Sequence, residues 1–107
     1  MDPQLKTRIE KEVSSHKIVI YMKGTALFPQ CGFSSMALEA LKPHGDVYAV
    51  DVLADPQVRE AIKQYTNWPT IPQIFINGKF VGGCDIVREL AERGELEGLV
   101  GGGAGAS

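Results

Sequence analysis

The stretch KIVIYMKGTALFPQCGFSSMALEALKPHGDVYAVDV, residues 17–52, decides the fold. It begins with a short apolar run rich in β-branched residues, 17–22, and ends with a second such run, 46–52. Both runs are typical of buried strands. Between them, Met36, Leu38 and Leu41 supply the apolar positions of one helix, which Ser34 or Ser35 caps and which KPHG at 42–45 ends. A strand, a helix and a strand within so few residues predict a right-handed parallel crossover.

The segments on either side of this unit also show regular patterns. Two helices are predicted from apolar residues that share one face: Leu5, Ile9 and Val13 within 3–13, and Val58, Ile62 and Tyr65 within 56–65. Residues 73–83 contain two strand-like runs joined by Asn77-Gly78, a strong signal for a tight hairpin. A last helix is predicted over 84–94, with Gly94 as its stop.

The resulting order is helix, strand, helix, strand, helix, hairpin, helix. It predicts an α/β protein with a thioredoxin-like fold, in which a four-stranded mixed β-sheet is flanked by helices on both faces. Residues 1–97 form this single domain. The Gly/Ala-rich tail, 98–107, has little to bury and is expected to be disordered.

Composition excludes several classes of function. The 11 basic and 13 acidic residues give a net charge of -2, so no basic footprint indicates nucleic acid or a membrane surface as partner. No apolar run approaches the roughly 20 residues that span a bilayer, and the polar opening resembles neither a signal nor a transit peptide. Two distant cysteines are too few for a disulfide framework, and neither they nor His16 and His44 have metal-site spacing. We expect a soluble protein of a reducing intracellular compartment.

The segment FPQCGFSS, residues 28–35, places Cys31 where a strand gives way to a helix. Many redox proteins carry a second cysteine three positions later, but this chain has Ser34 there. Helix N-terminal N–H groups and the helix dipole stabilise a thiolate over a thiol. A lone cysteine is more often buried and inert, but the polar and small neighbours of Cys31 favour an exposed turn. The partner of Cys31 then comes from elsewhere in the chain, from a small thiol or from a metal.

Four motifs resemble those of one family. MKGT (22–25), CGFS (31–34), NWPTIPQ (67–73) and GGCD (82–85), in this order and spacing, resemble the monothiol glutaredoxins of the CGFS class. The likeness covers about residues 3 to 97. The opening PQLKTRIEKEV looks most like the single-domain plastid members, which implies the plastid stroma as the compartment.

The resemblance implies a glutathione groove beside Cys31. Lys23 and Arg59 would hold the glycyl carboxylate, although lysine and arginine are most often solvated surface charges. Pro72 would follow a cis peptide bond, which leaves the Ile71 main chain free to pair with the cysteinyl part of glutathione; the alternative is a trans proline that opens an edge strand. Thr70 belongs to the same motif.

The resemblance places the γ-glutamyl end of glutathione at the start of the last helix. There the main chain of Gly83, Cys84 and Asp85 would bind its carboxylate, and the Asp85 side chain would accept from its ammonium group or would simply cap the helix. Phe33 and Trp68 would line the walls of the groove.

The family's cofactors are glutathione and a 2Fe-2S cluster. Such a cluster needs four ligands, most often thiolates, and each chain offers Cys31 plus one glutathione thiol. The resemblance therefore implies a homodimer bridged by the cluster, with Cys31 as metal ligand. The cluster would be passed to apo iron-sulfur proteins or shared with a BolA-like partner. The loop between Lys23 and Cys31 is longer than the loop of dithiol glutaredoxins, which agrees with cluster handling.

Two alternatives stay open at this point. In the first alternative, the protein is an enzyme, a glutathione-dependent thiol-disulfide oxidoreductase in which the catalytic Cys31 attacks a glutathionylated protein. The second concerns Cys84, which is either a small apolar residue at a helix start or a resolving cysteine. Because both cysteines are predicted at helix N-termini, both are expected to gain thiolate character.

Overall fold

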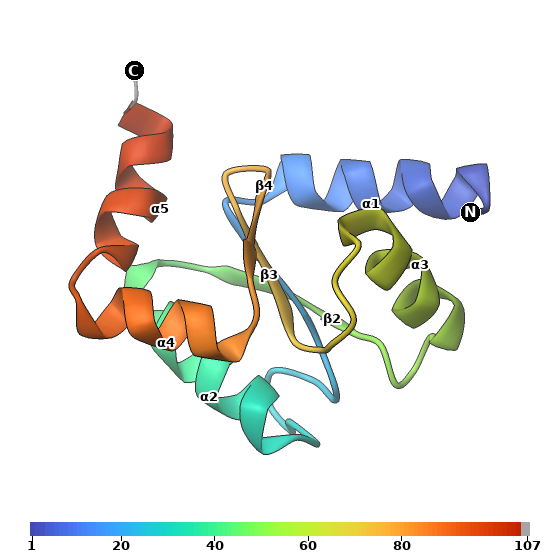
Figure 1. Ribbon diagram of the computed structural model, residues 1–107, viewed down its shortest axis with the longest axis horizontal. Coiled ribbons are helices and arrows are strands. Elements are labelled where there is room, and N and C mark those ends of the chain that lie inside the picture. Colours follow the sequence, from blue (N-terminus) through green and yellow to red (C-terminus); the bar gives the residue numbers. More distant parts are fainter. Residues whose placement is uncertain (106–107) are drawn as a thin grey trace.

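The computed structural model describes residues 1–105 (Figure 1). In chain order its elements are α1 (Pro3–Ser15), β1 (Ile18–Met22), α2 (Gly32–Leu41), the 3-10 turn η1 (Lys42–His44), β2 (Val47–Asp51), α3 (Pro56–Thr66), β3 (Gln73–Ile76), β4 (Lys79–Gly82), α4 (Cys84–Glu92) and α5 (Leu96–Gly105). The four strands form one sheet in the order β2-β1-β3-β4. β1 and β2 are parallel, whereas β1 with β3 and β3 with β4 are antiparallel, so the predicted mixed sheet is confirmed.

Helices cover both faces of the sheet, and this explains the unbroken apolar run of β1. Figure 1 shows α1 and α3 on one side of the sheet and α2 and α4 on the other. Every residue of β1 is buried, because alternate side chains enter two separate cores. One core holds Ile18, Ile20 and Met22 with residues of α2, α4 and α5; the other holds Val19 and Tyr21 with residues of α1 and α3.

Side-chain caps and a tight turn set the ends of several elements. Asp2 and Asp55 are the N-caps of α1 and α3, and each side chain accepts a main-chain N–H of the first turn, Gln4 N at 2.8 Å and Val58 N at 3.3 Å. The hairpin prediction is confirmed, since Asn77 and Gly78 both have positive φ, 53° and 81°. Two positive φ values are what a two-residue turn between twisted strands requires.

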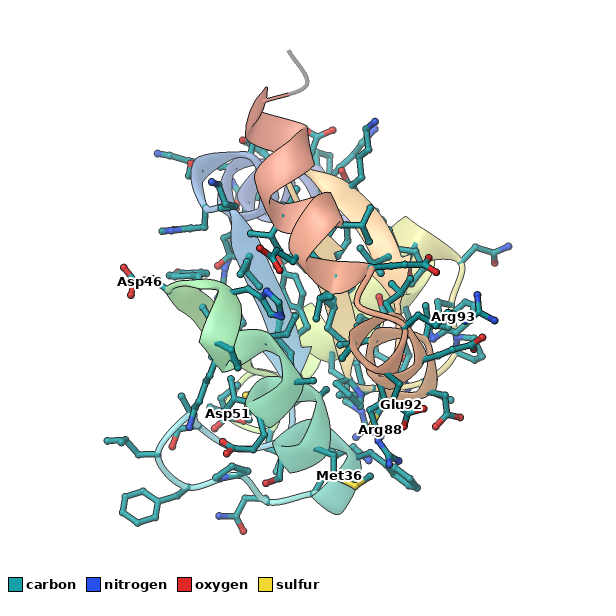
Figure 2. The ribbon with its side chains drawn as sticks, turned by 90° about the vertical axis from the view of Figure 1, so that its left-hand side faces the viewer. Met36, Asp46, Asp51, Arg88, Glu92 and Arg93 are labelled. Carbon is teal, nitrogen blue, oxygen red and sulfur yellow. The ribbon has the colours of Figure 1, made fainter. Side chains whose placement is uncertain are left out.

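The start of α2 differs from the prediction. The N-cap is Cys31, which makes no side-chain capping bond, and the helix begins at Gly32. Ser34 is therefore inside the helix and completely buried, and Ala37 faces the core with Leu38. Met36 is 38% exposed and lies on the outer surface of α2 (Figure 2), so its assignment to the apolar face was wrong. The buried stripe of the helix passes through positions 34, 37, 38 and 41, which leaves position 36 outside.

The C-terminal segment also differs from the prediction of disorder after residue 97. Residues 98–105 continue α5, which packs Leu96 and Val100 into the same core as α2 and α4. The Asn77 side chain donates to the Leu99 and Val100 carbonyls at 3.0 and 3.1 Å. Burial of Leu96 and Val100, one helical turn apart, thus stabilises this helix despite its glycine content. Residues 106–107 of the expected tail lie outside the described part of the chain.

Across residues 1–105, no helix combines the length and the apolar character that crossing a membrane requires.

Candidate functional site

Cys31 lies at the N-cap of α2, immediately after the loop that leaves β1. Its backbone is extended, with φ -144° and ψ 133°, and its side chain is half-buried. The Ser34 main-chain N–H, followed by the N–H of Phe33, the Ser34 hydroxyl and the charge of Lys23, holds the pKa of the Cys31 thiol below its ordinary value, against the opposing effect of partial burial. The predicted thiolate character and partial exposure of Cys31 are therefore confirmed.

Ser34, which stands where many redox proteins have a second cysteine, has a structural role of its own. Its buried hydroxyl accepts the Lys23 main-chain N–H at 3.1 Å, a bond between α2 and the end of β1. The Lys23 carbonyl in turn accepts the Gln30 N–H at 2.9 Å. The loop from Lys23 to Cys31 is thus closed at its base, and Lys23 is held beside Cys31.

A groove of about 270 Å³ lies between the Trp68–Pro72 turn and the start of α4. Seven of the predicted binding residues line it: Phe33, Thr70, Ile71, Pro72, Gly83, Cys84 and Asp85. Trp68 lines it too, as expected, and Ile86 is a lining residue that the sequence reasoning missed. Ile86 lies two residues into α4 from Cys84 and is 36% exposed. Its only sequence signal was its position directly after the GGCD motif.

The turn that forms one wall of the groove is organised by a buried polar residue, Gln73. Its side-chain amide donates to the Trp68 carbonyl at 2.9 Å and to the Thr70 carbonyl at 3.2 Å, and its oxygen accepts the Thr66 hydroxyl at 2.8 Å. Sequence reasoning missed Gln73, although a glutamine beginning the apolar strand QIFI marks a polar side chain with a specific partner. The Ile71–Pro72 peptide bond is cis, as the family resemblance implies.

The opposite wall is the N-terminus of α4. Gly83 is the N-cap, so no side chain caps this helix, and the alternative of Asp85 as the cap is wrong. Asp85 is the second helical residue and is exposed. A Cβ on Gly83 would lie 3.3 Å from the Pro72 carbonyl oxygen, a tight contact, and 3.5 Å from Trp68 Nε1, an ordinary one, so the two walls approach to van der Waals distance at this glycine.

Cys84 differs from the expectation of thiolate character. It is the first residue of α4 but is only 6% exposed, and burial, reinforced by the Asp85 carboxylate, raises the pKa of its thiol. The expectation was wrong because desolvation by the surrounding core outweighs the helix N-terminus and the nearby Arg88. The two cysteines therefore differ, with one activated thiol and one suppressed thiol.

Lys23 and Arg59 do not line the groove itself. Lys23 is half-buried, and its charge acts on Cys31. Arg59 is half-buried on α3, and its Nε is buried without a hydrogen-bond partner among the described residues. Trp68 Nε1 is likewise buried without a hydrogen-bond partner among the described residues, and the Trp68 ring packs edge-on against Phe80 with ring centroids 5.6 Å apart. The roles of both cations in ligand binding stay predictions.

The chain matches the family model described as Glutaredoxin over residues 18–81. It is 50% identical to the "Uncharacterized monothiol glutaredoxin ycf64-like" of Synechocystis sp., over 91% of this chain and 92% of the relative. It is 46% identical to "Monothiol glutaredoxin-S14, chloroplastic" of Arabidopsis thaliana, over 91% of this chain and 57% of that protein.

The same kinship appears among solved structures. The solution structure of reduced poplar apo GrxS14 superposes with a TM-score of 0.85 at 44% sequence identity, covering 96% of this chain and 95% of that one. With a thioredoxin-like sheet, one activated cysteine at a helix N-terminus and serine where a second cysteine would stand, the chain belongs to the glutaredoxin family and, within it, to the monothiol glutaredoxins.

Proposed function

We propose that this glutaredoxin binds glutathione in the groove beside Cys31 and, as a cluster-bridged homodimer, carries a 2Fe-2S cluster to apo iron-sulfur proteins. One observation carries the proposal: the chain has a single partly exposed thiol with a lowered pKa, Cys31, whereas its second cysteine, Cys84, is buried with a raised pKa. One chain therefore supplies one good thiolate ligand. The remaining thiolates of a four-ligand set must come from outside that chain.

The groove has groups suited to each part of glutathione. Among the described residues, neither the N–H nor the C=O of Ile71 has a hydrogen-bond partner, which favours strand-like pairing with a bound peptide. The uncapped N-terminus of α4 at Gly83 suits the γ-glutamyl carboxylate, and exposed Asp85 suits its ammonium group. In this proposal Lys23 and Arg59 bind the glycyl carboxylate, and Phe33 and Thr70 line the sides.

The donor chemistry of the site fits an iron-sulfur cargo. Thiolates are the ligands such clusters prefer, and the partial exposure of Cys31 leaves its sulfur open to a second molecule. In a bridged dimer each chain holds the cargo through Cys31 and through the thiol of its own glutathione. Because half of these ligands diffuse freely, the cargo is held in a form that can be released.

Anaerobic reconstitution with iron, sulfide and glutathione tests the proposal. Wild-type protein should develop a visible cluster spectrum and run as a dimer in size-exclusion chromatography, and as a monomer without the cluster. Cys31→Ser should fold, by circular dichroism, yet hold no cluster. The matched control is Cys84→Ser, which should keep the cluster. A folded Cys31→Ser protein with a stoichiometric cluster, or a monomeric loaded wild type, would refute the assignment.

The lowered pKa of Cys31 supports a second candidate function, a glutathione-dependent thiol-disulfide oxidoreductase. In this reaction the Cys31 thiolate attacks the glutathione sulfur of a glutathionylated protein, which breaks the mixed disulfide, releases the protein thiolate and leaves Cys31 glutathionylated. A second glutathione then attacks this disulfide, which restores the Cys31 thiolate and releases oxidised glutathione. Both functions use the same groove. Absence of a cluster band after reconstitution, together with measurable deglutathionylation that Cys31→Ser abolishes, would favour the enzyme.

We propose the plastid stroma or an equivalent reducing compartment as the location, supported by chloroplastic relatives such as the Arabidopsis protein. A BolA-like protein is a proposed alternative partner to the second chain. A fluorescent fusion tests the location. Co-purification after reconstitution tests the partner, and a cluster spectrum that changes on adding it is the expected result.

A further inference from the structure

Asp51, the last residue of β2, joins two segments through a single carboxylate oxygen. Its Oδ1 accepts the Leu53 N–H at 2.9 Å, a local bond of the turn that follows β2. The same oxygen accepts the Gly24 N–H at 2.9 Å, across 27 positions of the chain. The parallel register sets Asp51 opposite Met22, so the chain leaving β1 passes directly beside this carboxylate. Figure 2 shows Asp51 next to that loop.

The bond from Asp51 completes a clamp on the main chain at Lys23 and Gly24. The Lys23 N–H donates to Ser34 Oγ at 3.1 Å, the Lys23 carbonyl accepts from Gln30 N at 2.9 Å, and the Gly24 N–H donates to Asp51. The three partners come from α2, from the loop and from β2. Asp51 is the charged member, and hydrogen bonds to an ionised acceptor are about twice as strong as neutral ones.

The backbone at Gly24 has little conformational freedom. Its φ is +94°, and a Cβ built on it would lie 2.5 Å from Gln30 N and 2.6 Å from the Phe28 carbonyl oxygen. The chain therefore runs against its own loop at this point. The direction in which Lys23 leaves the backbone is set by the three hydrogen bonds rather than by packing of a side chain at position 24.

We propose that Asp51 is a positioning residue for glutathione: by holding the Gly24 N–H, it directs the Lys23 ammonium toward the glycyl carboxylate. This inference rests on the proposed function, in which Lys23 binds that carboxylate. Asp51 acts through the main chain and does not itself touch the ligand. Its negative charge opposes the binding of an anion nearby, so its contribution comes from the geometry it imposes and not from its charge.

Two substitutions at position 51 separate the long-range bond from the charge. Asp51→Asn keeps an acceptor oxygen in the same place and removes the charge. Asp51→Ser retains an acceptor for the local turn bond to Leu53, but its shorter side chain does not reach Gly24. The matched control is Asp46→Ser at the other end of β2, where Asp46 is exposed, makes no hydrogen bond or ion pair with residues 1–105, and points into solvent (Figure 2).

Isothermal titration of the reduced, cluster-free protein with glutathione gives the dissociation constant for each variant, at a temperature where thermal unfolding shows all of them folded. Asp51→Ser should bind roughly three- to tenfold more weakly, as expected for loss of one hydrogen bond. Asp51→Asn should bind within about twofold of wild type or more tightly, and Asp46→Ser should be unchanged within the same margin. Lys23→Met in each background completes a double-mutant cycle, in which Asp51→Ser should have no further effect once Lys23 is gone.

Several outcomes would overturn the inference. If Asp51→Ser binds glutathione with wild-type affinity, the bond from Asp51 to Gly24 has no role in binding. If the effects of Asp51→Ser and Lys23→Met are additive, Asp51 does not act through Lys23. A wild-type protein that does not bind glutathione refutes the proposed function and this inference with it, whereas the first two results leave the proposed function standing. Hydrogen exchange of the wild-type Gly24 amide is independent of variant stability: we expect protection, and an unprotected amide would refute the clamp.

Discussion

Substitution of Ser34 by alanine tests the main structural claim about the site, namely that this serine holds the loop and stabilises the thiolate. Ser34 is fully buried, and its hydroxyl is the acceptor of the Lys23 N–H at 3.1 Å. Alanine removes the acceptor and leaves that partly buried N–H without a partner. The cost of such an unpaired group is about 1–3 kcal/mol, which lowers the melting temperature of a domain of this size by roughly 5–15 °C.

Urea unfolding monitored by circular dichroism measures the change in the free energy of unfolding. Ser35→Ala is the matched control, because Ser35 lies in the same helical turn, is half-buried, and makes no side-chain hydrogen bond within the described residues. The control should change stability by no more than about 0.5 kcal/mol. Equal effects of the two substitutions would show that the Ser34 bond contributes nothing.

The same variant has a predicted effect on Cys31. Because the Ser34 hydroxyl is one of the groups that lower the pKa of Cys31, alanine should raise that pKa, and the midpoint of pH-dependent alkylation by iodoacetamide should move to higher pH. A folded-state pKa below the ordinary 9.0 stabilises the fold above the unfolded-state pKa, and this contribution is lost as pH falls through the folded-state pKa. Wild-type stability should therefore gain from this group as pH rises toward about 9, and Ser34→Ala should gain less. An unchanged alkylation midpoint would refute the role of the hydroxyl.

Three further predictions concern other parts of the molecule. Gly24→Ala forces a Cβ to 2.5 Å from Gln30 N at φ +94° and should reduce the free energy of unfolding by about 3 kcal/mol. The control Gly98→Ala in α5, with open space around its Cβ, should increase the free energy of unfolding by about 0.5–1 kcal/mol. If urea unfolding shows no change in Gly24→Ala, the close packing around Gly24 is refuted. The Asp55 carboxylate, paired with Arg8 at 2.9 Å, has a pKa lowered from 3.8, so its contribution to stability should be present above that value and be lost as pH falls through the folded-state pKa. Asp55→Asn should reduce the loss of unfolding free energy at acidic pH. If wild type and Asp55→Asn depend on pH in the same way, the ion pair of Asp55 with Arg8 does not contribute to stability. Cys84→Ser should retain the cluster and lose any intramolecular disulfide formed under oxidant, as measured by counting free thiols; loss of the cluster would make Cys84 a ligand.

Local patterns in the sequence predicted most of the fold. The apolar run 17–22 and the Asn77-Gly78 turn are each read over a few neighbouring residues, and the structure has them where they were expected. These signals work because strand burial, helix capping and turn geometry depend on nearby backbone and side-chain chemistry. The position of Cys31 at a strand-to-helix switch, which lowers its pKa, belongs to the same class of local information.

The groove could be predicted from motifs but not from patterning alone. Thr70, Ile71, Pro72 and the GGCD segment were assigned to it by resemblance, and the structure brings them together from two distant turns. Ile86 and Gln73 were missed. Ile86 lines the groove because of the side of α4 that faces it, and Gln73 organises the turn because the Trp68 and Thr70 carbonyls lie within reach of its buried amide. Both facts are known only when the partner element is in place.

Only the tertiary structure decided how the two cysteines differ. By sequence, Cys31 and Cys84 both begin helices and both should be activated; in the fold, the core of α2, α4 and α5 covers Cys84 and raises its pKa, while Cys31 stays half-exposed. The same holds for Ser34 with Lys23 and for Asp51 with Gly24, which pair across 11 and 27 positions. Desolvation and long-range hydrogen bonds depend on what the rest of the chain places around a residue, whereas helix starts and turns depend on its immediate neighbours.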